Sequence, residues 1–345
     1  MKAVSMDRRI ASCVAGLSLA ASAALGGAAL AQEPAGAAPV RAPAVLSMSD
    51  LKVTATIAIA KRTDWIKLTP SSVWVGSKAP FAVSEIDPKT NRVVTVELPG
   101  DPCGGLGADA DNLWVPLCGA TPKLAKVDLK TRTLSAVFDV GPGRPEGGIA
   151  VGAGSVWLMI DTQGTLARID PATGSITGKV QLPPGSYNPL FSEGRLWVTR
   201  ADGAELTVVD ARTTKVVDHV PTGQHPRFLT AGAGAVWILN QGDGSLSRID
   251  VAKRRPVETV PLQTPGPGGD IAYADGRVWT TMMKTPLTAV DAARSVVLCQ
   301  WKGAGGDAIG VGHGAIWLTD LPTGTVLRIA LSDLPKACRA AGSGR

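Results

Sequence analysis

Two stretches decide the fold of this chain: Ile149-Ala150-Val151-Gly152-Ala153-Gly154-Ser155-Val156-Trp157 and Leu166-Ala167-Arg168-Ile169-Asp170-Pro171-Ala172-Thr173-Gly174. Versions of this unit occur seven times along the sequence. A tryptophan holds the same place in every copy, at Trp74, Trp114, Trp157, Trp197, Trp237, Trp279 and Trp317. Successive copies are therefore 38 to 43 residues apart, and a fixed period of this length indicates a repeat architecture.

The second half of the unit ends at an aspartate 12 to 14 residues past the tryptophan in six copies, at Asp87, Asp128, Asp170, Asp210, Asp250 and Asp291. The seventh copy has Ile329-Ala330 in that place. The third copy contains four short segments typical of strands, separated by turns rich in Gly, Pro and Asp, at 148–151, 156–160, 165–169 and 175–181. Four short antiparallel strands with close, even turns predict one blade of a β-propeller.

The seven repeat tryptophans are interpreted as core residues. Aromatic residues are otherwise scarce, with nine Trp, four Phe and two Tyr in 345 residues. A large flat side chain at one fixed strand position fills the space between neighbouring blades, and its indole N–H reaches a loop carbonyl. We therefore do not expect these tryptophans to form a ligand cage.

The two ends of the repeat region predict how the ring closes. The last copy has no fourth strand after 325–329, and the strand-like segment 53–60 has no blade of its own. If 53–60 supplies the missing outer strand, no radial edge stays open. The predicted fold is all-β: a seven-bladed β-propeller of four-stranded antiparallel blades over residues 53–330, closed by an N-terminal strand that completes the last blade.

The remaining segments are assigned by composition. Residues 1–31 have a basic start, an apolar run and small residues before Gln32, which is typical of a signal peptide, although the run could instead be kept as an anchor. Residues 32–52 are rich in Ala and Pro and are expected to be a flexible lead-in, and 331–345 to be a C-terminal tail. We expect a periplasmic or secreted protein with no membrane span in the mature chain.

Four cysteines remain after the leader, and an even number in an exported chain favours disulfides. Three pairings are open. Cys103 begins the inner strand of blade two and Cys118 ends the next strand, so the two should face each other across an antiparallel pair. Cys299 at the end of blade six would then bond Cys338 in the tail. The alternative is four free buried thiols.

The charge balance argues against nucleic acid as a partner. The formal net charge is +6 for the whole chain, and the leader accounts for two of these charges. The basic residues are spread along the repeats, and no basic block is present. We expect a monomer with a small molecule or a protein as partner.

The repeated strings Gly-x-Gly-x-Val-Trp and Arg-Ile-Asp-Pro-x-Thr-Gly resemble the bacterial YVTN-type propellers and the streptogramin (virginiamycin B) lyase superfamily. The resemblance covers residues 53–330. The lyase branch implies elimination with a divalent metal, usually magnesium, held near an acid-x-His pattern before an inner strand and a second acid after the repeat Trp. Here Asp320 matches the second acid, whereas Gly305 and Asp307 stand in place of the first acid and the His. The general base of that mechanism is therefore missing.

Loops that precede the inner strands meet at one mouth of the channel, where propellers commonly bind ligands. Four blades bring Gly-Gly doublets there, at 104–105, 147–148, 268–269 and 305–306. The expected polar wall consists of Arg144, Glu146, Tyr187, Asn188, His225 and Arg227, and the opposing acidic wall of Asp64, Asp270 and Asp307. Those three carboxylates are also candidates for holding Ca²⁺ or Mg²⁺. In the alternative interpretation, all nine are solvated loop residues.

The resulting expectation is an exported, non-catalytic propeller that binds a ligand or protein through its channel face. The first alternative is a metal-dependent lyase or hydrolase at the same mouth. The second is an accessory partner of a periplasmic dehydrogenase. No catalytic triad, phosphate loop or dinucleotide fingerprint occurs in a suitable context, and so few histidines make a zinc site a poor candidate.

Overall fold

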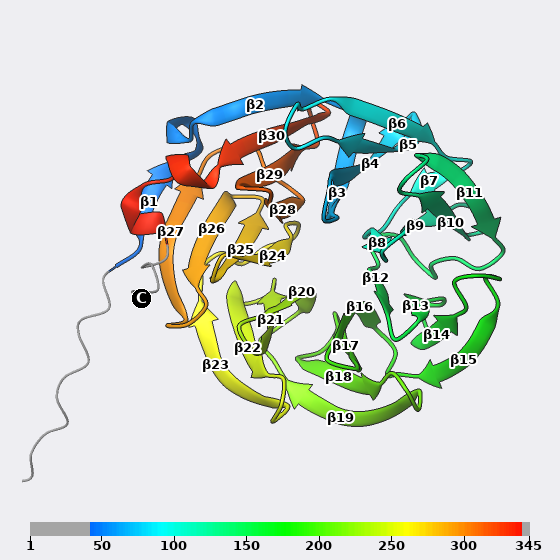
Figure 1. The fold of residues 1–345 in the computed structure, drawn as a ribbon. Coiled ribbons are helices and arrows are strands. Elements are labelled where there is room, and N and C mark those ends of the chain that lie inside the picture. Colours follow the sequence, from blue (N-terminus) through cyan, green and yellow to red (C-terminus); the bar gives the residue numbers. More distant parts are fainter. Residues whose placement is uncertain (1–41, 340–345) are drawn as a thin grey trace, which may run out of the picture. The chain divides into compact units, whose positions relative to one another are not determined.

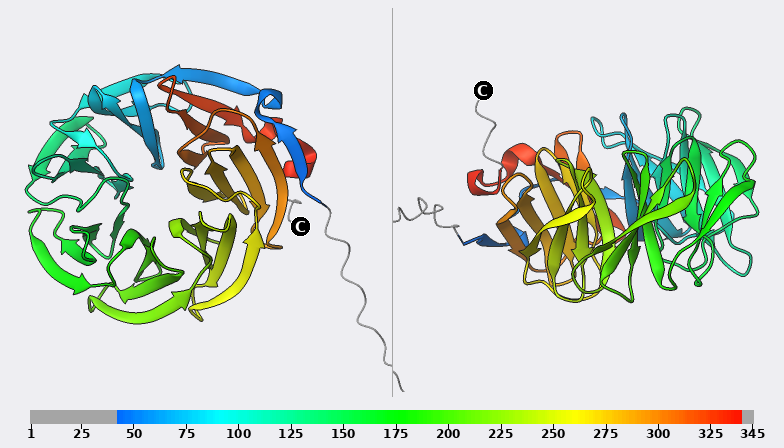
Figure 2. Two further views of the ribbon diagram at one scale, coloured as in Figure 1. Left: turned by 180° about the vertical axis from the view of Figure 1, so that it is seen from behind. Right: turned by 90° about the horizontal axis from the view of Figure 1, so that it is seen from below.

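The computed structural model describes residues 42–339, and these form seven β-sheets arranged as blades around a central channel (Figure 1). Figure 2 shows the same ring from behind and from below, with the strands of each blade stacked from the centre to the periphery. The predicted seven-bladed, four-stranded, all-β architecture is confirmed. The signal-peptide prediction for residues 1–31 falls outside the described residues.

The blades follow the chain in order. Blade one comprises β3 (Lys61–Leu68), β4 (Val73–Ala79), β5 (Phe81–Ile86) and β6 (Val93–Glu97). Blade two comprises β7 (Asp101–Pro102), β8 (Gly107–Ala108), β9 (Asn112–Cys118), β10 (Lys123–Asp128) and β11 (Thr133–Phe138). Blade three comprises β12 (Ile149–Gly152), β13 (Ser155–Met159), β14 (Thr165–Ile169) and β15 (Ile176–Gln181). Blade four comprises β16 (Ser186–Ser192), β17 (Arg195–Arg200), β18 (Glu205–Asp210) and β19 (Lys215–Pro221).

The remaining blades continue the pattern. Blade five comprises β20 (Pro226–Gly232), β21 (Ala235–Asn240), β22 (Ser245–Asp250) and β23 (Arg255–Pro261). Blade six comprises β24 (Ile271–Ala274), β25 (Arg277–Met282), β26 (Thr285–Asp291), β27 (Val296–Lys302) and the additional strand β1 (Ala44–Ser47). Blade seven comprises β28 (Ile309–Gly312), β29 (Ala315–Asp320), β30 (Thr325–Ala330) and β2 (Val53–Ala58). Three 3-10 turns, η1 (Met48–Asp50), η2 (Leu331–Asp333) and η3 (Lys336–Cys338), complete the described elements.

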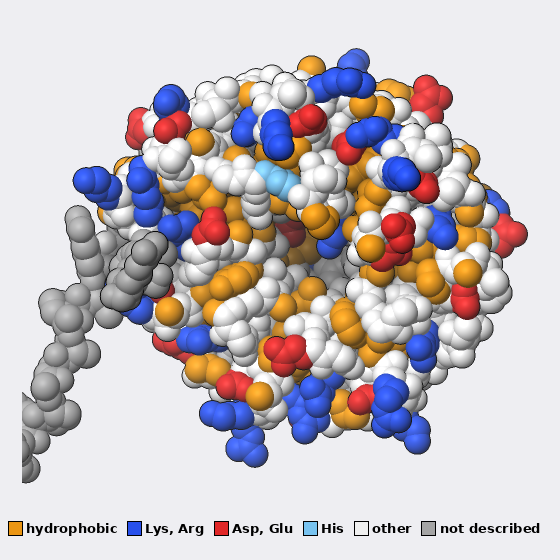
Figure 3. Space-filling model, viewed as in Figure 1, with side chains coloured by type: hydrophobic (Ala, Val, Ile, Leu, Met, Phe, Trp, Pro, Cys, Tyr) orange, Lys and Arg blue, Asp and Glu red, His pale blue; other side chains and the backbone are white. Residues whose placement is uncertain are grey.

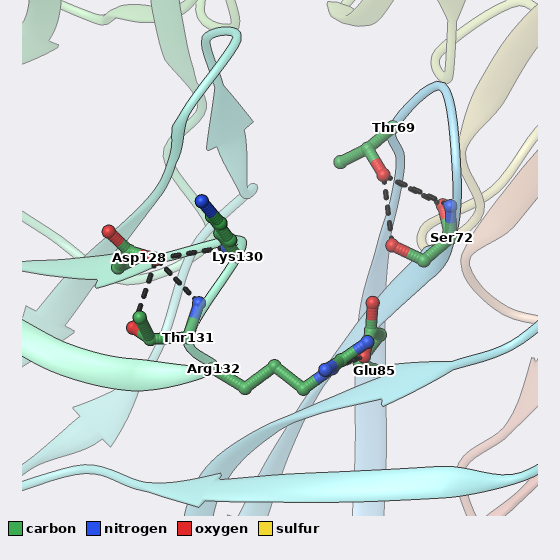
Figure 4. Close-up of polar contacts among 7 residues, drawn as sticks. All are labelled: Thr69, Ser72, Glu85, Asp128, Lys130, Thr131 and Arg132. Atoms are coloured by element: carbon green, nitrogen blue, oxygen red, sulfur yellow. Dashed lines mark hydrogen bonds and ion pairs between the residues drawn. The ribbon is translucent and has the colours of Figure 1, made fainter.

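Repeated turn chemistry sets the strand spacing. Between β12 and β13, Ala153 and Gly154 have φ values of 51° and 66°, as a two-residue hairpin of type I′ requires. Between β10 and β11, the Asp128 carboxylate accepts hydrogen bonds from the backbone N–H groups of Lys130 and Thr131 (Figure 4). The next residue, Arg132, forms an ion pair with Glu85 of blade one (Figure 4), so this turn also joins two blades.

The repeat tryptophans are core residues, as predicted. All seven are fully buried. The indole N–H donates to a backbone carbonyl five residues earlier in four copies, as from Trp157 to Gly152 and from Trp237 to Gly232. Trp114 donates to the Asp109 carboxylate instead, and the indole nitrogens of Trp74 and Trp279 have no partner within the described chain.

The ring closes as predicted, because β2 pairs antiparallel with β30, with Val53 opposite Ile329 and Ala58 opposite Thr325. The prediction of a flexible lead-in over residues 32–52 is wrong for its second half, because β1 at 44–47 pairs parallel with β27 of blade six. Val45 is exposed at 63% while the neighbouring Leu46 packs on the core around Trp301. The N-terminal segment therefore joins blade six to blade seven. Residues 32–41 lie outside the described part.

Both predicted disulfides are present. Cys103 bonds Cys118, and Cys299 bonds Cys338. The predicted simple facing of Cys103 and Cys118 is wrong in detail, because the inner strand of blade two is interrupted between β7 and β8, and Asp101 is the residue opposite Cys118. Cys299 lies within β27 and not at its end. The second bond ties the C-terminal η3 to blade six.

Replacing either cysteine pair by serine should lower the melting temperature, and the loss should be greater for the bond that closes the longer loop. The Cys299–Cys338 bond closes 39 residues and the Cys103–Cys118 bond closes 15. A longer closed loop restricts the unfolded chain more, and each bond is worth about 2–4 kcal/mol. We expect the Cys299→Ser/Cys338→Ser variant to melt several degrees below wild type, and below the Cys103→Ser/Cys118→Ser variant. Calorimetry measures both values, and the reverse order would contradict the assignment of the C-terminal bond as the stronger clamp.

Candidate functional site

A cavity of about 320 Å³ lies at the channel mouth, where residues that precede or begin the inner strands meet. It contains all three predicted acidic-wall residues, Asp64, Asp270 and Asp307. Glu146 and Arg227 of the predicted polar wall also line it. The structure thus brings together five of the nine predicted residues, contributed by five different blades. Figure 3 shows the ring in the view of Figure 1, with a hollow at the channel and Lys and Arg side chains around the periphery of that face.

The other four predicted residues have different places. Tyr187 is buried, and its ring lies between the guanidinium groups of Arg144 and Arg227, whose Cζ atoms are 4.0 and 4.2 Å from the ring centroid. The Tyr187 hydroxyl donates to the Pro145 carbonyl and accepts from Arg227 Nη2 at 2.8 Å. Tyr187 therefore holds Arg227 in position, and Arg144 packs on the same ring.

Asn188 joins neighbouring blades, since its side chain accepts from the Gly148 N–H and donates to the Arg227 carbonyl. His225 is exposed, and its Nδ1 lies 2.9 Å from the Ala201 carbonyl oxygen. It lines an adjoining depression that shares Arg227 and Gln241 with the main cavity. His225 thus borders the main cavity without lining it, and Asn188 lines a separate cavity in the channel.

The Gly-Gly doublets serve close packing at the mouth. A Cβ atom on Gly104 would lie 2.4 Å from the Gly147 carbonyl oxygen, and one on Gly269 would lie 1.9 Å from that of Thr281. The mouth loops can therefore approach one another only because side chains are absent at these positions.

The acidic wall carries two carboxyl groups with strongly raised pKa values. Burial, with repulsion from Asp307 added, raises the pKa of Asp64 from 3.8 to about 7. Burial likewise raises the pKa of Asp270 to about 7, although its oxygens accept from the N–H groups of Ile271 and Ile309. Within residues 42–339, none of the three aspartates of this wall forms an ion pair. Arg62 and Lys78 line the same cavity, and the charge of Lys78 only partly offsets the rise in the pKa of Asp64.

The expectation of a Ca²⁺ or Mg²⁺ site gains no support from this geometry. Across the described part of the chain, no group of three or more His, Cys, Asp or Glu side chains is arranged to hold a metal ion. Asp64, Asp270 and Asp307 influence one another's charge without converging on a common centre.

Sequence reasoning missed Trp65, which lines the cavity beside Phe228, with ring centroids 6.3 Å apart. Trp65 is 7% exposed, its indole nitrogen has no partner within residues 42–339, and its φ is 57°. A bulky residue in this left-handed region is strained, and such strain is concentrated at functional sites. The available signal was that Trp65 is one of two tryptophans outside the repeat position.

Backbone strain recurs around this mouth. Within residues 42–339, fifteen non-glycine residues have positive φ, and ten of them occupy the repeated turns between strands. The other five are Arg62, Trp65, Glu146, His225 and Gln263. Arg62, Trp65 and Glu146 line the main cavity and His225 lines the adjoining depression. The mouth thus departs from the regular repeat in the way that functional sites often do.

Comparison with known proteins identifies an architecture. No protein-family model and no curated protein matches this sequence. Among solved structures, BamB from Moraxella catarrhalis matches with a TM-score of 0.57 at 12% identity, over 83% of this chain and 99% of that one. In all, 1484 chains of solved structures match, so the similarity is shared far too widely to indicate one activity. The described residues contain no helix of the length and apolarity needed to span a membrane. What the structure and these comparisons establish together is a β-propeller.

Proposed function

We propose that this protein binds a small zwitterionic molecule, such as an amino acid or short peptide, in the channel-mouth cavity. The observation that carries the proposal is the opposition of charges in one cavity. Carboxyl groups that form no ion pair within residues 42–339 lie on blades one, six and seven, and Arg227 lies on blade five. Arg62 and Lys78 of blade one also line the cavity. An ammonium group of the ligand would pair with the acidic wall, and an acidic group would meet Arg227.

Arg227 is suited to this role because it is held rigidly and keeps free donors. Stacking on Tyr187 fixes the guanidinium plane, and among the described residues only Nη2 of this group forms a hydrogen bond or ion pair, which leaves the Nη1 donors free. Its contact with Glu146 is loose, at 3.9 Å. A preorganised guanidinium grips a carboxylate at two points. The Trp65 and Phe228 rings offer an apolar surface for the body of the ligand.

The role proposed is binding without catalysis, in an exported protein. The apolar leader and two disulfides support export to the periplasm or the outside of the cell. The repeat strings support a relationship to the YVTN-type and streptogramin lyase-like propellers. A lyase of that type remains the alternative, and it needs a general base. The titratable residues lining the cavity include Asp64 and Asp270 but no histidine.

Three matched probe classes test the binding proposal: free amino acids and dipeptides, the corresponding amines without the carboxylate, and the corresponding acids without the amino group. Ligand-observed NMR at pH 7.5 should detect the zwitterions and show weaker binding by either half-molecule. Arg227→Ala should weaken zwitterion binding by about 1–3 kcal/mol, the range for a charged hydrogen-bond partner. It should leave the affinity for the amines nearly unchanged.

The matched control is His313→Ala, in the hairpin turn between β28 and β29, which should bind like wild type. Arg227→Ala also loses its stacking on Tyr187, so its melting temperature should be recorded and binding measured well below it. If wild type and Arg227→Ala bound every probe with equal affinity, the ligand site would not be at this mouth.

A further inference from the structure

A second cavity, of about 180 Å³, lies in the channel and is lined by residues of all seven blades. Three of these residues, Trp65, Phe228 and Asp270, also line the mouth cavity. The two cavities therefore adjoin, with an aromatic pair and one carboxyl of the acidic wall at their boundary. A ligand whose ammonium group pairs with Asp270 has the channel cavity as the space next to it.

Irregular strand pairing places the residues of this boundary. The register of β3 against β4 shifts at Trp65, and the register of β20 against β21 shifts at Arg227, the residue before Phe228. The inner strands β24 and β28 pair with β25 and β29 without such a shift. An extra residue in a strand re-aims the side chains around it, and such bulges are common beside functional sites. The irregularities that bring Arg227 to the mouth thus also bring the two aromatic rings to the boundary.

Apolar side chains make up most of the side-chain lining of the channel cavity. Six of them are more than nine-tenths buried: Trp65, Leu106, Ile149, Phe228, Ile271 and Ile309. Gly105 and Gly148 add backbone to the wall. In another protein, a cavity of about 150 Å³ lined by Leu, Ile and Phe binds benzene. The channel cavity is therefore large enough for one aromatic ring.

The polar side chains of the lining offer little to a charged group. The Asn188 amide accepts from the Gly148 N–H and donates to the Arg227 carbonyl. Both oxygens of Asp270 accept backbone N–H groups. Lys67 is half-buried, and a lysine of this kind keeps its ammonium hydrated while its hydrocarbon stem adds apolar surface. Because a charge is costly to bury without a partner, the cavity favours an uncharged ring.

We propose that the channel cavity is the side-chain pocket of the zwitterion site, and that it selects an aromatic side chain the size of that of phenylalanine. The inference rests on the proposed function, since the ammonium group of the ligand stays at the acidic wall and its acidic group at Arg227. The ligand ring joins Trp65 and Phe228, whose centroids are 6.3 Å apart with planes inclined by 60°. Tilted contacts at this spacing are favourable between aromatic rings.

Calorimetric titration at pH 7.5 tests the selection with alanine, leucine, phenylalanine and glutamate, each free and as the first residue of a dipeptide with glycine. In whichever form binds, phenylalanine should bind about tenfold or more tighter than alanine, because burial of a large apolar side chain is worth at least this factor. Leucine should lie between the two.

Gly105→Leu tests whether the channel cavity is the pocket. Gly105 lines the cavity, its φ is not positive, and a Cβ atom there would meet only the Gly148 Cα, at 3.5 Å. The new side chain should occupy part of the pocket, lower the affinity for phenylalanine to that for alanine, and leave the affinity for alanine unchanged. The control is Gly178→Leu on β15, where a Cβ atom also has only ordinary contacts. It should bind both compounds like wild type, and the melting temperatures of both variants should be recorded.

Three results would count against the proposal. Equal affinities for alanine and phenylalanine, both weakened by Arg227→Ala, would overturn the aromatic pocket and leave the zwitterion site standing. Tighter binding of glutamate than of phenylalanine would also overturn it and would indicate that Lys67 pairs with the ligand. If no zwitterion bound in either form, the proposed function would be wrong, and the side-chain pocket with it.

Discussion

Deletion of residues 42–58 is expected to abolish cooperative folding of the ring, with a loss of more than about 5 kcal/mol, which is comparable to the whole stability of a typical domain. The deletion removes β2, exposes the edge of β30 and opens the cluster in which Ile57 packs with Val73 and Trp317. An unpaired strand edge is a site of aggregation. Light scattering and circular dichroism during heating measure the effect.

The matched control is deletion of residues 42–50, which removes β1 and η1 and retains β2. Because β1 makes only four residue pairs with β27, this variant should remain monodisperse and melt a few degrees below wild type. If the 42–58 deletion melted within a few degrees of the full-length chain and stayed monodisperse, β2 would not be the closing strand.

Asp64→Asn is expected to stabilise the protein at pH 8 and to weaken ligand binding at the same time. The pKa of Asp64 is about 7 in the folded protein, against an ordinary value of 3.8. Between these pH values the folded state binds more protons than the unfolded state, so the free energy of unfolding falls as pH rises from about 4 to about 7 and stays low above that. Asparagine does not ionise, so it avoids this loss of stability. Its side-chain oxygen can still accept a hydrogen bond from the Trp65 N–H, as Asp64 does at 2.8 Å.

We expect a gain of about 1–3 kcal/mol at pH 8 and almost none at pH 4, since one pKa unit corresponds to about 1.4 kcal/mol and the carboxyl is partly exposed to the cavity. Urea denaturation at the two pH values measures it. Zwitterion binding should weaken at least tenfold because the ligand's ammonium loses a carboxylate. Asp111→Asn, at an exposed turn, should show neither change. If the Asp64→Asn protein were less stable than wild type at pH 8, ionisation of the buried Asp64 carboxyl would not be destabilising the folded protein.

The regular part of the molecule was readable from the sequence because each feature is local or periodic. The tryptophan period predicted seven blades, the unmatched strands at the two ends predicted the β2–β30 pairing, and cysteine placement on neighbouring strands predicted the Cys103–Cys118 bond. Even there, the break between β7 and β8 was missed, because it depends on how Gly104 packs against Gly147 of the next blade.

The irregular part depends on contacts between segments far apart in the chain. Nothing in the sequence Ala44–Ser47 indicates a parallel pairing with β27, which tertiary packing selects. The strained backbone of Trp65 and its position in the mouth cavity follow from neighbouring blades and not from its own repeat. The sequence placed Asp64, Asp270 and Asp307 at one mouth, but the raised pKa values of Asp64 and Asp270 result from burial.

Crystallographic screening of amino acids and their amine and acid halves, soaked at pH 7.5, tests whether the channel mouth binds zwitterions. We expect density for zwitterions in the mouth cavity, with the amino group at Asp64, Asp270 and Asp307 and the acidic group at Arg227. Density for the same compounds only elsewhere on the molecule, with this cavity holding water alone, would contradict it.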